Sequence, residues 1–161
     1  MAVLQRKRRD NGYLLAEWLT FIFLYGMLFS GLYMGVAGNE RTLAMIQVES
    51  AAREFAQDLL RTRERALAGS DSGFVKLSSG RKGYWVYRGP NLVEKRRDFA
   101  SAGSVALQFS NIPAYIIKFS INGSPSASGL FVLQHERIAS AQVKVSLQPV
   151  TGRIQVERVG L

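Results

Sequence analysis

The chain has 161 residues, enough for one ordinary domain and one further element but too few for a large multidomain enzyme. Hydrophobic residues make up 47% of the sequence and charged residues 20%, which fits neither a disordered chain nor a protein with many membrane spans. The sequence has no cysteine and one histidine, His135, which excludes a thiolate metal site and a multi-histidine metal centre. The net charge of +9 favours a polyanion or an acidic membrane surface as a partner.

The N-terminal region combines a basic segment with a long apolar segment. Residues 6–9 read Arg-Lys-Arg-Arg, and residues 13–38 contain one charged residue, Glu17, and no proline. A helix over residues 13–38 would be about 39 Å long, enough to cross a hydrocarbon core of about 30 Å. The sequence therefore predicts one span through membrane lipid. Because the basic residues precede the span, we expect a cytoplasmic N-terminus and an extracytoplasmic chain from residue 39 onward.

Glu17 is unusual within this apolar segment. The segment is longer than the roughly 7–15 apolar residues of a secretory signal peptide, so Glu17 lies in a membrane span. A carboxylate at the centre of a membrane costs about 2.5–3.5 kcal/mol on insertion scales. Two readings follow from the residues alone. Glu17 either reaches headgroup water near the cytoplasmic interface or pairs with a cation inside the membrane.

The order of residues around Glu17 resembles a known processing signal. Basic residues precede Gly12, an aromatic residue, Tyr13, follows it, and Glu17 is the fifth residue after Gly12. This order resembles the N-terminus of type IV prepilins and of the pseudopilins of type II secretion and competence systems. The resemblance implies that a prepilin peptidase cleaves between Gly12 and Tyr13 and that the new N-terminal residue, Tyr13, is methylated. It also implies that Glu17 pairs with the N-terminal amine of a neighbouring subunit during assembly.

The helical pattern continues beyond the apolar segment. Apolar residues recur at spacings of three, four and seven positions, and charged residues occupy the opposite face. The apolar stripe comprises Met45, Val48, Ala52, Phe55, Leu59 and Ala66, and the charged face comprises Arg53, Glu54, Arg61, Arg63 and Glu64. Gly69 and residues 70–73 are expected to end the helix. The sequence thus predicts one helix of about 55 residues, with a rise of about 1.5 Å per residue. We expect its apolar stripe to pack on the globular domain.

The remaining chain is predicted to form antiparallel strands. Each strand shows apolar alternation, and turn residues separate the strands. The expected strands are residues 74–77, 84–88, 105–109, 115–119, 130–134, 143–147 and 154–156. Residues 122–129 are expected to form an exposed loop, and residues 149–152 to turn a terminal hairpin.

Together these elements predict an α+β fold with one long N-terminal membrane-spanning helix packed on an antiparallel β-sheet domain. The expected segments are a leader (1–12), a transmembrane helix (13–38), its extracytoplasmic continuation (39–69) and a β-rich domain (70–161). This organisation resembles the minor-pseudopilin branch of the family. The resemblance implies insertion in the cytoplasmic (inner) membrane and assembly into a cell-surface or periplasmic filament. Its implied partners are other pilin or pseudopilin subunits and an inner-membrane assembly platform.

No catalytic constellation is evident in the sequence. His135 follows an apparent strand within Gln-His-Glu-Arg, a mixed-charge run typical of a solvated strand end. The acidic residues lack calcium-loop spacing, and residues 79–83 lack the strand-loop-helix context of a phosphate-binding loop. The sequence predicts no enzyme, no cofactor and no metal site.

Basic residues near aromatic residues suggest an alternative function. Cations interleaved with aromatic rings can bind single-stranded nucleic acid through charge and stacking. The candidate residues are Arg81, Lys82, Lys95, Arg96, Arg97 and Arg153, with Tyr84, Trp85 and Tyr87 close to them in sequence. The competing interpretation is a solvated basic loop beside core aromatic residues. The alternative function is therefore an unprocessed membrane-anchored domain that binds DNA or another polyanion.

Overall fold

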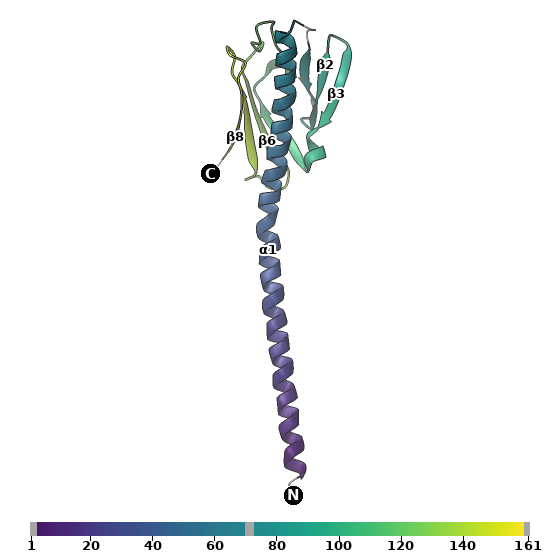
Figure 1. Ribbon diagram of the computed structural model, residues 1–161, viewed down its shortest axis with the longest axis vertical. Coiled ribbons are helices and arrows are strands. Elements are labelled where there is room, and N and C mark those ends of the chain that lie inside the picture. Colours follow the sequence, from purple (N-terminus) through teal and green to yellow (C-terminus); the bar gives the residue numbers. More distant parts are fainter. Residues whose placement is uncertain (1–2, 70–72, 160–161) are drawn as a thin grey trace. The chain divides into compact units, whose positions relative to one another are not determined.

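The protein consists of one long helix followed by strands (Figure 1). The computed structural model describes residues 3–69 and 73–159, without the side chains of residues 3–14, 34–38, 102 and 113. The chain divides into two compact units, Met1–Glu40 and Arg41–Leu161. The first unit is helical in its described part, and the second holds the rest of the helix and all described strands.

The helix α1 (Val3–Leu67) begins earlier than the sequence predicts. We expected it to begin at Tyr13, but the preceding basic segment is rich in Arg, Lys, Leu and Gln, which favour a helix. The helix ends at Leu67, two residues before the expected end at Gly69. Gly69 has a positive φ of 68°, and its N–H donates to the Ala66 carbonyl (3.2 Å), which closes the last turn. The adjoining residues 70–72, also expected to help end the helix, lie outside the described residues.

Two four-stranded antiparallel sheets follow α1, where the sequence predicts one sheet. The first has the order β3-β2-β1-β5, formed by β1 (Phe74–Leu77), β2 (Gly83–Arg88), β3 (Leu92–Asp98) and β5 (Ile116–Lys118). The second has the order β4-β6-β7-β8, formed by β4 (Val105–Ser110), β6 (Gly129–His135), β7 (Gln142–Leu147) and β8 (Ile154–Arg158). The pairs β1–β5 and β4–β6 join strands distant in sequence, so alternation alone could not assign them to two sheets.

Most of the expected strands are present. Two strand assignments and one loop differ from the expectation. The strand β3 was not predicted, because its residues Leu-Val-Glu-Lys-Arg-Arg-Asp lack apolar alternation. Tyr115 lies in the short 3₁₀ helix η2 (Pro113–Tyr115) and not in a strand, since its φ of 56° is incompatible with extended backbone. The loop at residues 122–129 is only partly exposed, because Gly123 and Pro125 are buried.

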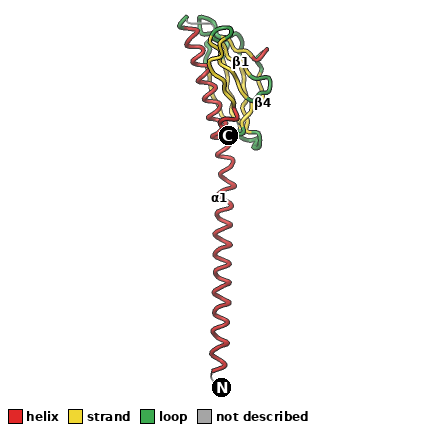
Figure 2. Tube along the Cα trace, turned by 90° about the vertical axis from the view of Figure 1, so that its right-hand side faces the viewer, coloured by secondary structure: helices red, strands yellow, loops and turns green. Residues whose placement is uncertain are grey.

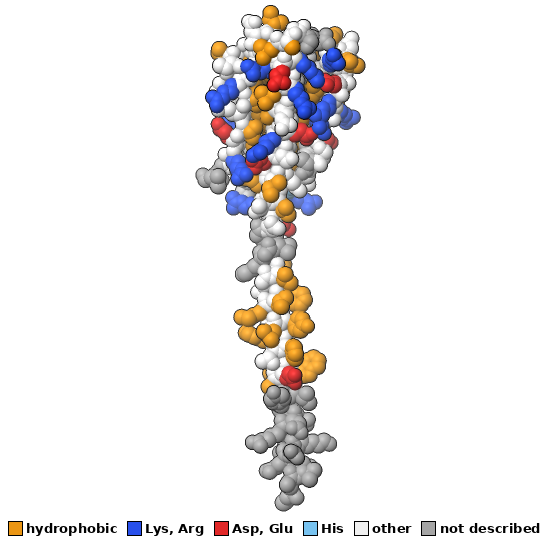
Figure 3. Space-filling model, in the orientation of Figure 1, with side chains coloured by type: hydrophobic (Ala, Val, Ile, Leu, Met, Phe, Trp, Pro, Cys, Tyr) orange, Lys and Arg blue, Asp and Glu red, His pale blue; other side chains and the backbone are white. Residues whose placement is uncertain are grey.

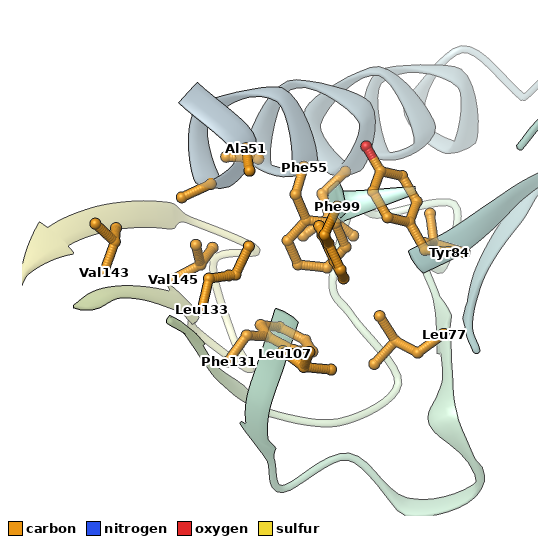
Figure 4. Close-up of a cluster of buried hydrophobic side chains, with 14 of the residues drawn as sticks. Ala51, Phe55, Leu77, Tyr84, Phe99, Leu107, Phe131, Leu133, Val143 and Val145 are labelled. Atoms are coloured by element: carbon orange, nitrogen blue, oxygen red, sulfur yellow. The ribbon is translucent and has the colours of Figure 1, made fainter. Parts of the chain in front are cut away.

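The hydrophobic core lies between α1 and the two sheets. The part of α1 within the second unit lies along one side of the strands (Figure 2). Its predicted stripe is confirmed, with Val48, Ala52, Phe55, Leu59 and Ala66 buried and Met45 packed against them. The side chain of Phe55 points from α1 toward the sheets (Figure 4). Its ring lies edge-on to those of Tyr84 (4.9 Å between centroids), Phe131 (5.1 Å) and Phe99 (5.9 Å).

Candidate functional site

The apolar part of α1 is long enough to cross a membrane. The qualifying segment is Leu15–Tyr33, with 19 residues and a mean hydropathy of 1.5. None of this segment is buried within the protein, and apolar side chains project from the face of it that Figure 3 shows. Thr20 Oγ1 donates to the carbonyls of Ala16 (2.9 Å) and Glu17 (2.8 Å), which satisfies this hydroxyl inside the helix. Apart from Glu17, the segment therefore has an apolar surface, and its Thr20 hydroxyl is already hydrogen-bonded.

Glu17 lies on an aromatic stripe of this segment. It shares one side of α1 with Trp18, Phe21, Ile22 and Tyr25, which line a hollow beside it. Spacings of three, four and seven residues place these side chains on one face of the helix. They are exposed, because no described residue packs on that face. Among the side chains that the structure describes, none forms an ion pair with Glu17. The stripe thus presents one carboxylate within an apolar surface.

Gly12 and Tyr13 fall within α1. The side chain of Tyr13 lies outside those that the structure describes. Cleavage between the two residues and methylation of Tyr13 therefore stay predictions of the sequence.

In the second unit, β3 contacts the charged face of α1. Lys95 Nζ donates to both carboxylate oxygens of Asp58 (2.9 and 3.1 Å), and Arg97 forms an ion pair with Glu54 (2.6 Å). Glu94 binds Arg65 through two hydrogen bonds, one of them 2.7 Å long. Three residues of β3 therefore meet charges of opposite sign on α1.

A β-bulge makes this arrangement possible. Val86 pairs with Lys95 and Tyr87 pairs with Val93, so Glu94 is an extra residue without a partner on β2. A bulge of this kind redirects the side chain of the extra residue and increases local twist. As a result Glu94 joins Lys95 and Arg97 in contacting α1, whereas strict alternation would point it away.

Asp58 is the central residue of this contact and was not among the residues predicted from the sequence. Its side chain is 4% exposed and accepts a hydrogen bond from the Tyr84 hydroxyl (2.8 Å) in addition to the bonds from Lys95. Burial, and then the Asp58 carboxylate beside it, raises the pKa of Tyr84 well above its ordinary value, so Tyr84 remains a neutral donor. The signal available in the sequence was an acidic residue four positions after Glu54 on the helix.

The six residues predicted to bind a polyanion do not share one environment. Lys95 and Arg97 are half-buried and paired with the carboxylates of α1. Arg96 lies on the other side of β3, with its guanidinium 5.9 Å from the centre of the Trp85 ring. The remaining three are exposed in turns, namely Arg81 and Lys82 before β2 and Arg153 before β8. Lys and Arg side chains gather over the β2–β3 side of the unit, with acidic side chains among them (Figure 3).

These contacts change the interpretation of the basic cluster. Residues 95–97 belong to a strand and not to a solvated loop, and two of the three cations are neutralised by α1. Binding of DNA or another polyanion by Arg81, Lys82, Lys95, Arg96, Arg97 and Arg153 stays a prediction.

His135 is buried at the end of β6, so the expectation of a solvated histidine is wrong. Its Nδ1 accepts a hydrogen bond from the backbone N–H of Arg137 (3.3 Å), which gives the ring a structural role at the strand end. Among the described residues, no group of three or more His, Asp and Glu side chains is placed to hold a metal ion.

Comparison with known proteins identifies the fold. Neither a protein-family model nor a curated protein matches the sequence. The structure is similar to crystal structures of the type IV minor pilin FimU of Pseudomonas aeruginosa, with TM-scores of 0.58 and 0.54 and 18% sequence identity. The two matches cover 74% and 67% of this chain and 91% and 90% of FimU.

A second similar structure is the minor pseudopilin EpsH from the type 2 secretion system of Vibrio cholerae. Its TM-score is 0.56 at 14% identity, over 70% of this chain and 97% of EpsH. At these identities the comparison establishes the fold. The chain has a pilin-like α+β fold, similar to that of type IV minor pilins and minor pseudopilins.

Proposed function

We propose that the protein is a minor pilin or pseudopilin subunit that assembles into a type IV pilus-like filament or a type II secretion or competence pseudopilus. The observation that carries this proposal is an unburied apolar segment, Leu15–Tyr33, on the same helix that packs against a pilin-like globular unit. An apolar surface of this size needs either lipid or other helices around it. A subunit that moves from the membrane into a filament is surrounded first by lipid and then by other helices. Such a role is structural and not enzymatic.

Processing would prepare the subunit for assembly. The precursor inserts in the inner membrane with residues 6–9 on the cytoplasmic side, and a prepilin peptidase cleaves between Gly12 and Tyr13. Cleavage creates an ammonium group at Tyr13, which the resemblance predicts to be methylated. The new cation lies at the end of the apolar segment that contains Glu17.

Assembly would then follow from the burial of the apolar surface and the pairing of charge. On the assembly platform, helix-to-helix packing replaces the contacts between Leu15–Tyr33 and lipid. The Glu17 carboxylate is costly in an apolar environment unless a cation neutralises it. Pairing with the N-terminal ammonium of a neighbouring subunit removes that cost and fixes the axial position of one subunit relative to the next.

The role of Glu17 can be tested by substitution. In cells that assemble the filament, we expect Glu17→Ala to leave membrane insertion unchanged, because the substitution makes the segment more apolar. We expect the amount recovered in sheared filaments to fall at least tenfold, since loss of about 1.4 kcal/mol of pairing already has that effect. The measurements are carbonate extraction of membranes and immunoblotting of filament fractions.

A matched control is Glu40→Ala, which removes an exposed carboxylate from the same helix beyond the apolar segment. This variant should be incorporated as the wild type is. Normal incorporation of Glu17→Ala would remove Glu17 from the assembly mechanism.

A further inference from the structure

The last strand, β8, forms an open edge of the second sheet. It pairs with β7 in a regular register, with Leu147 opposite Ile154 and Val143 opposite Arg158. Figure 1 shows β8 at the outer left side of the globular unit. An open edge presents unpaired backbone N–H and C=O groups that can accept a further strand.

The hydrogen bonds at both ends of the β7–β8 hairpin show which backbone groups of β8 point away from β7. Gln148 N donates to the Arg153 carbonyl (3.0 Å), and Val159 N donates to the Gln142 carbonyl (3.2 Å). Antiparallel residues alternate between bonding to the partner and pointing away from it. The odd-numbered residues of β8 therefore bond to β7. The backbone groups directed to the open edge belong to Ile154, Val156 and Arg158.

The other sheet edges in the described part of the chain are protected. The strand β3 has a bulge and a row of charged side chains, and β4 also has an irregular register between Leu107 and Phe109. The strand β5 has three residues, and the Lys118 carbonyl accepts a hydrogen bond from Ser126 N (2.8 Å). Short length, bulges and edge charges are the features that prevent strand addition. Within the described residues, β8 has a regular register without a bulge, and no loop covers it.

A hollow of about 360 Å³ lies where α1 meets the end of β8. It is lined by Ile46, Glu49, Ser50, Arg53 and Arg158. Ile46 is 56% exposed, and Val156 is 36% exposed although its pairing partner Val145 is fully buried. Because directly paired residues project to the same face, Ile154, Val156 and Arg158 face α1. The open edge therefore adjoins an apolar flank that an added strand would cover.

The charges in this hollow are unbalanced. The Glu49 carboxylate binds Arg158 (2.6 Å) and Arg53 (2.5 Å), so two guanidinium groups share one carboxylate. Hydrogen bonds from Arg158 and then Arg53 lower the pKa of Glu49, which keeps it ionised. One positive charge remains, and a carboxylate from a ligand would neutralise it.

We propose that the β8 edge binds an extended segment of a partner protein, which adds to the second sheet as an antiparallel strand. The segment has apolar side chains opposite Ile154 and Val156 and a carboxylate opposite Arg158. Main-chain hydrogen bonds provide affinity, and the alternate side chains provide specificity. This site is separate from the apolar segment that carries the proposed assembly, and its test requires neither processing nor filament formation.

The probe is a capped synthetic peptide, Thr-Glu-Thr-Val-Thr-Val-Thr, titrated into the full-length chain in detergent micelles. In antiparallel orientation its glutamate lies opposite Arg158 and its valines lie opposite Val156 and Ile154. We expect saturable binding with new hydrogen-exchange protection at the amides of Val156 and Arg158. A peptide carrying backbone N-methyl groups on both valines keeps the side chains but loses two donors to β8, so its affinity should be at least tenfold weaker.

The protein variant Val156→Pro removes one outward N–H while leaving the β7–β8 hydrogen bonds in place. It should bind the peptide at least tenfold more weakly, whereas the matched control Val156→Thr keeps the N–H and should bind within about threefold of the wild type. If Val156→Pro lowers the unfolding midpoint, the methylated peptide alone decides the test.

Three results would overturn the proposal. One is the absence of saturable binding to the wild-type chain, and another is equal affinity for the methylated and unmethylated peptides. The third is dimerisation of the chain alone that Val156→Pro abolishes, which would make a second copy, and not a partner protein, the occupant of the edge.

Discussion

At the residue scale, Asp58 joins the helix to the first sheet. Its carboxylate lies on α1, is almost fully buried, and accepts hydrogen bonds from Tyr84 on β2 and Lys95 on β3. A buried charge is tolerated only where opposite charge and hydrogen bonds compensate for the lost water. Asp58 has both, so the helix cannot move along the sheet without exposing unpaired polar groups.

Replacing Asp58 should therefore be costly. We expect Asp58→Ala to lower the free energy of unfolding by about 3 kcal/mol, because it leaves the ammonium of Lys95 and the hydroxyl of Tyr84 without their partner. Urea unfolding of the full chain in detergent, followed by the near-ultraviolet circular dichroism of the globular unit, measures the change. The control Glu64→Ala lies on an exposed position of the same helix and should change the value by less than about 0.5 kcal/mol. A similar effect of the two substitutions would show that the Asp58 contacts do not stabilise the fold.

Glu49 predicts a dependence of stability on pH. Hydrogen bonds from Arg158 and then Arg53 hold its folded-state pKa below its ordinary value of 4.5. A group with a lowered folded pKa stabilises the protein above its unfolded pKa, and this stabilisation is lost as pH falls through the folded pKa. We expect the wild type to lose stability on acidification below about pH 4.5, and Glu49→Gln to lose less over the same interval. Urea unfolding at a series of pH values tests this, and parallel curves for the two proteins would exclude the contribution of Glu49.

At the element scale, the turn of the terminal hairpin is held against α1 by Arg63 and by close backbone packing. Arg63 Nε donates to the Gly123 carbonyl (3.2 Å), and its Nη2 donates to the Thr151 carbonyl (3.1 Å). Gly152 has a φ of 60°, and a Cβ at this position would lie 2.2 Å from the Gly123 carbonyl oxygen. The β7–β8 turn and the loop before β6 can therefore pack together only with glycine at position 152.

Substituting this glycine should separate the hairpin from the loop. We expect Gly152→Ala to destabilise the protein by more than the roughly 1–2 kcal/mol that a positive φ alone costs an alanine. Gly89→Ala is the matched control, because Gly89 has a φ of 77° with open space around its Cβ position and should show only the φ cost. Urea unfolding midpoints of the two variants give the comparison. Equal destabilisation would mean that the contact with Gly123 relaxes without cost.

Some strands could be predicted from the sequence, and others could not. Val143, Val145 and Leu147 alternate because one face of β7 is buried, so the pattern predicted that strand and its hairpin partner. The strand β3 has no such pattern, since Lys95 and Arg97 contact carboxylates of α1 where other strands have apolar residues. Glu54 was predicted only as part of the charged face of the helix, and Asp58 was not singled out. Their partners are distant in sequence, and only the pairing of β2 with β3 places them within reach.

At the scale of the whole molecule, the chain combines an apolar helical segment with a globular unit of pilin-like fold. Each part was predictable from the sequence, the first from uninterrupted hydrophobicity and the second from helix-to-strand organisation. The division of the strands into two sheets was not predictable, because it depends on pairing between distant segments. The proposed function requires the two parts together with removal of the basic leader, residues 1–12.

The most direct test of this account is the mature N-terminus. The full-length protein would be coexpressed with an active prepilin peptidase, and its intact mass and N-terminal peptide determined by mass spectrometry. We predict a chain that begins at Tyr13, with or without one methyl group, and an unprocessed chain for Gly12→Val, which places a branched side chain beside the cleaved bond. An intact leader on the wild-type chain, when the same peptidase cleaves a control prepilin, would contradict the proposed function and favour an unprocessed membrane-anchored binding domain.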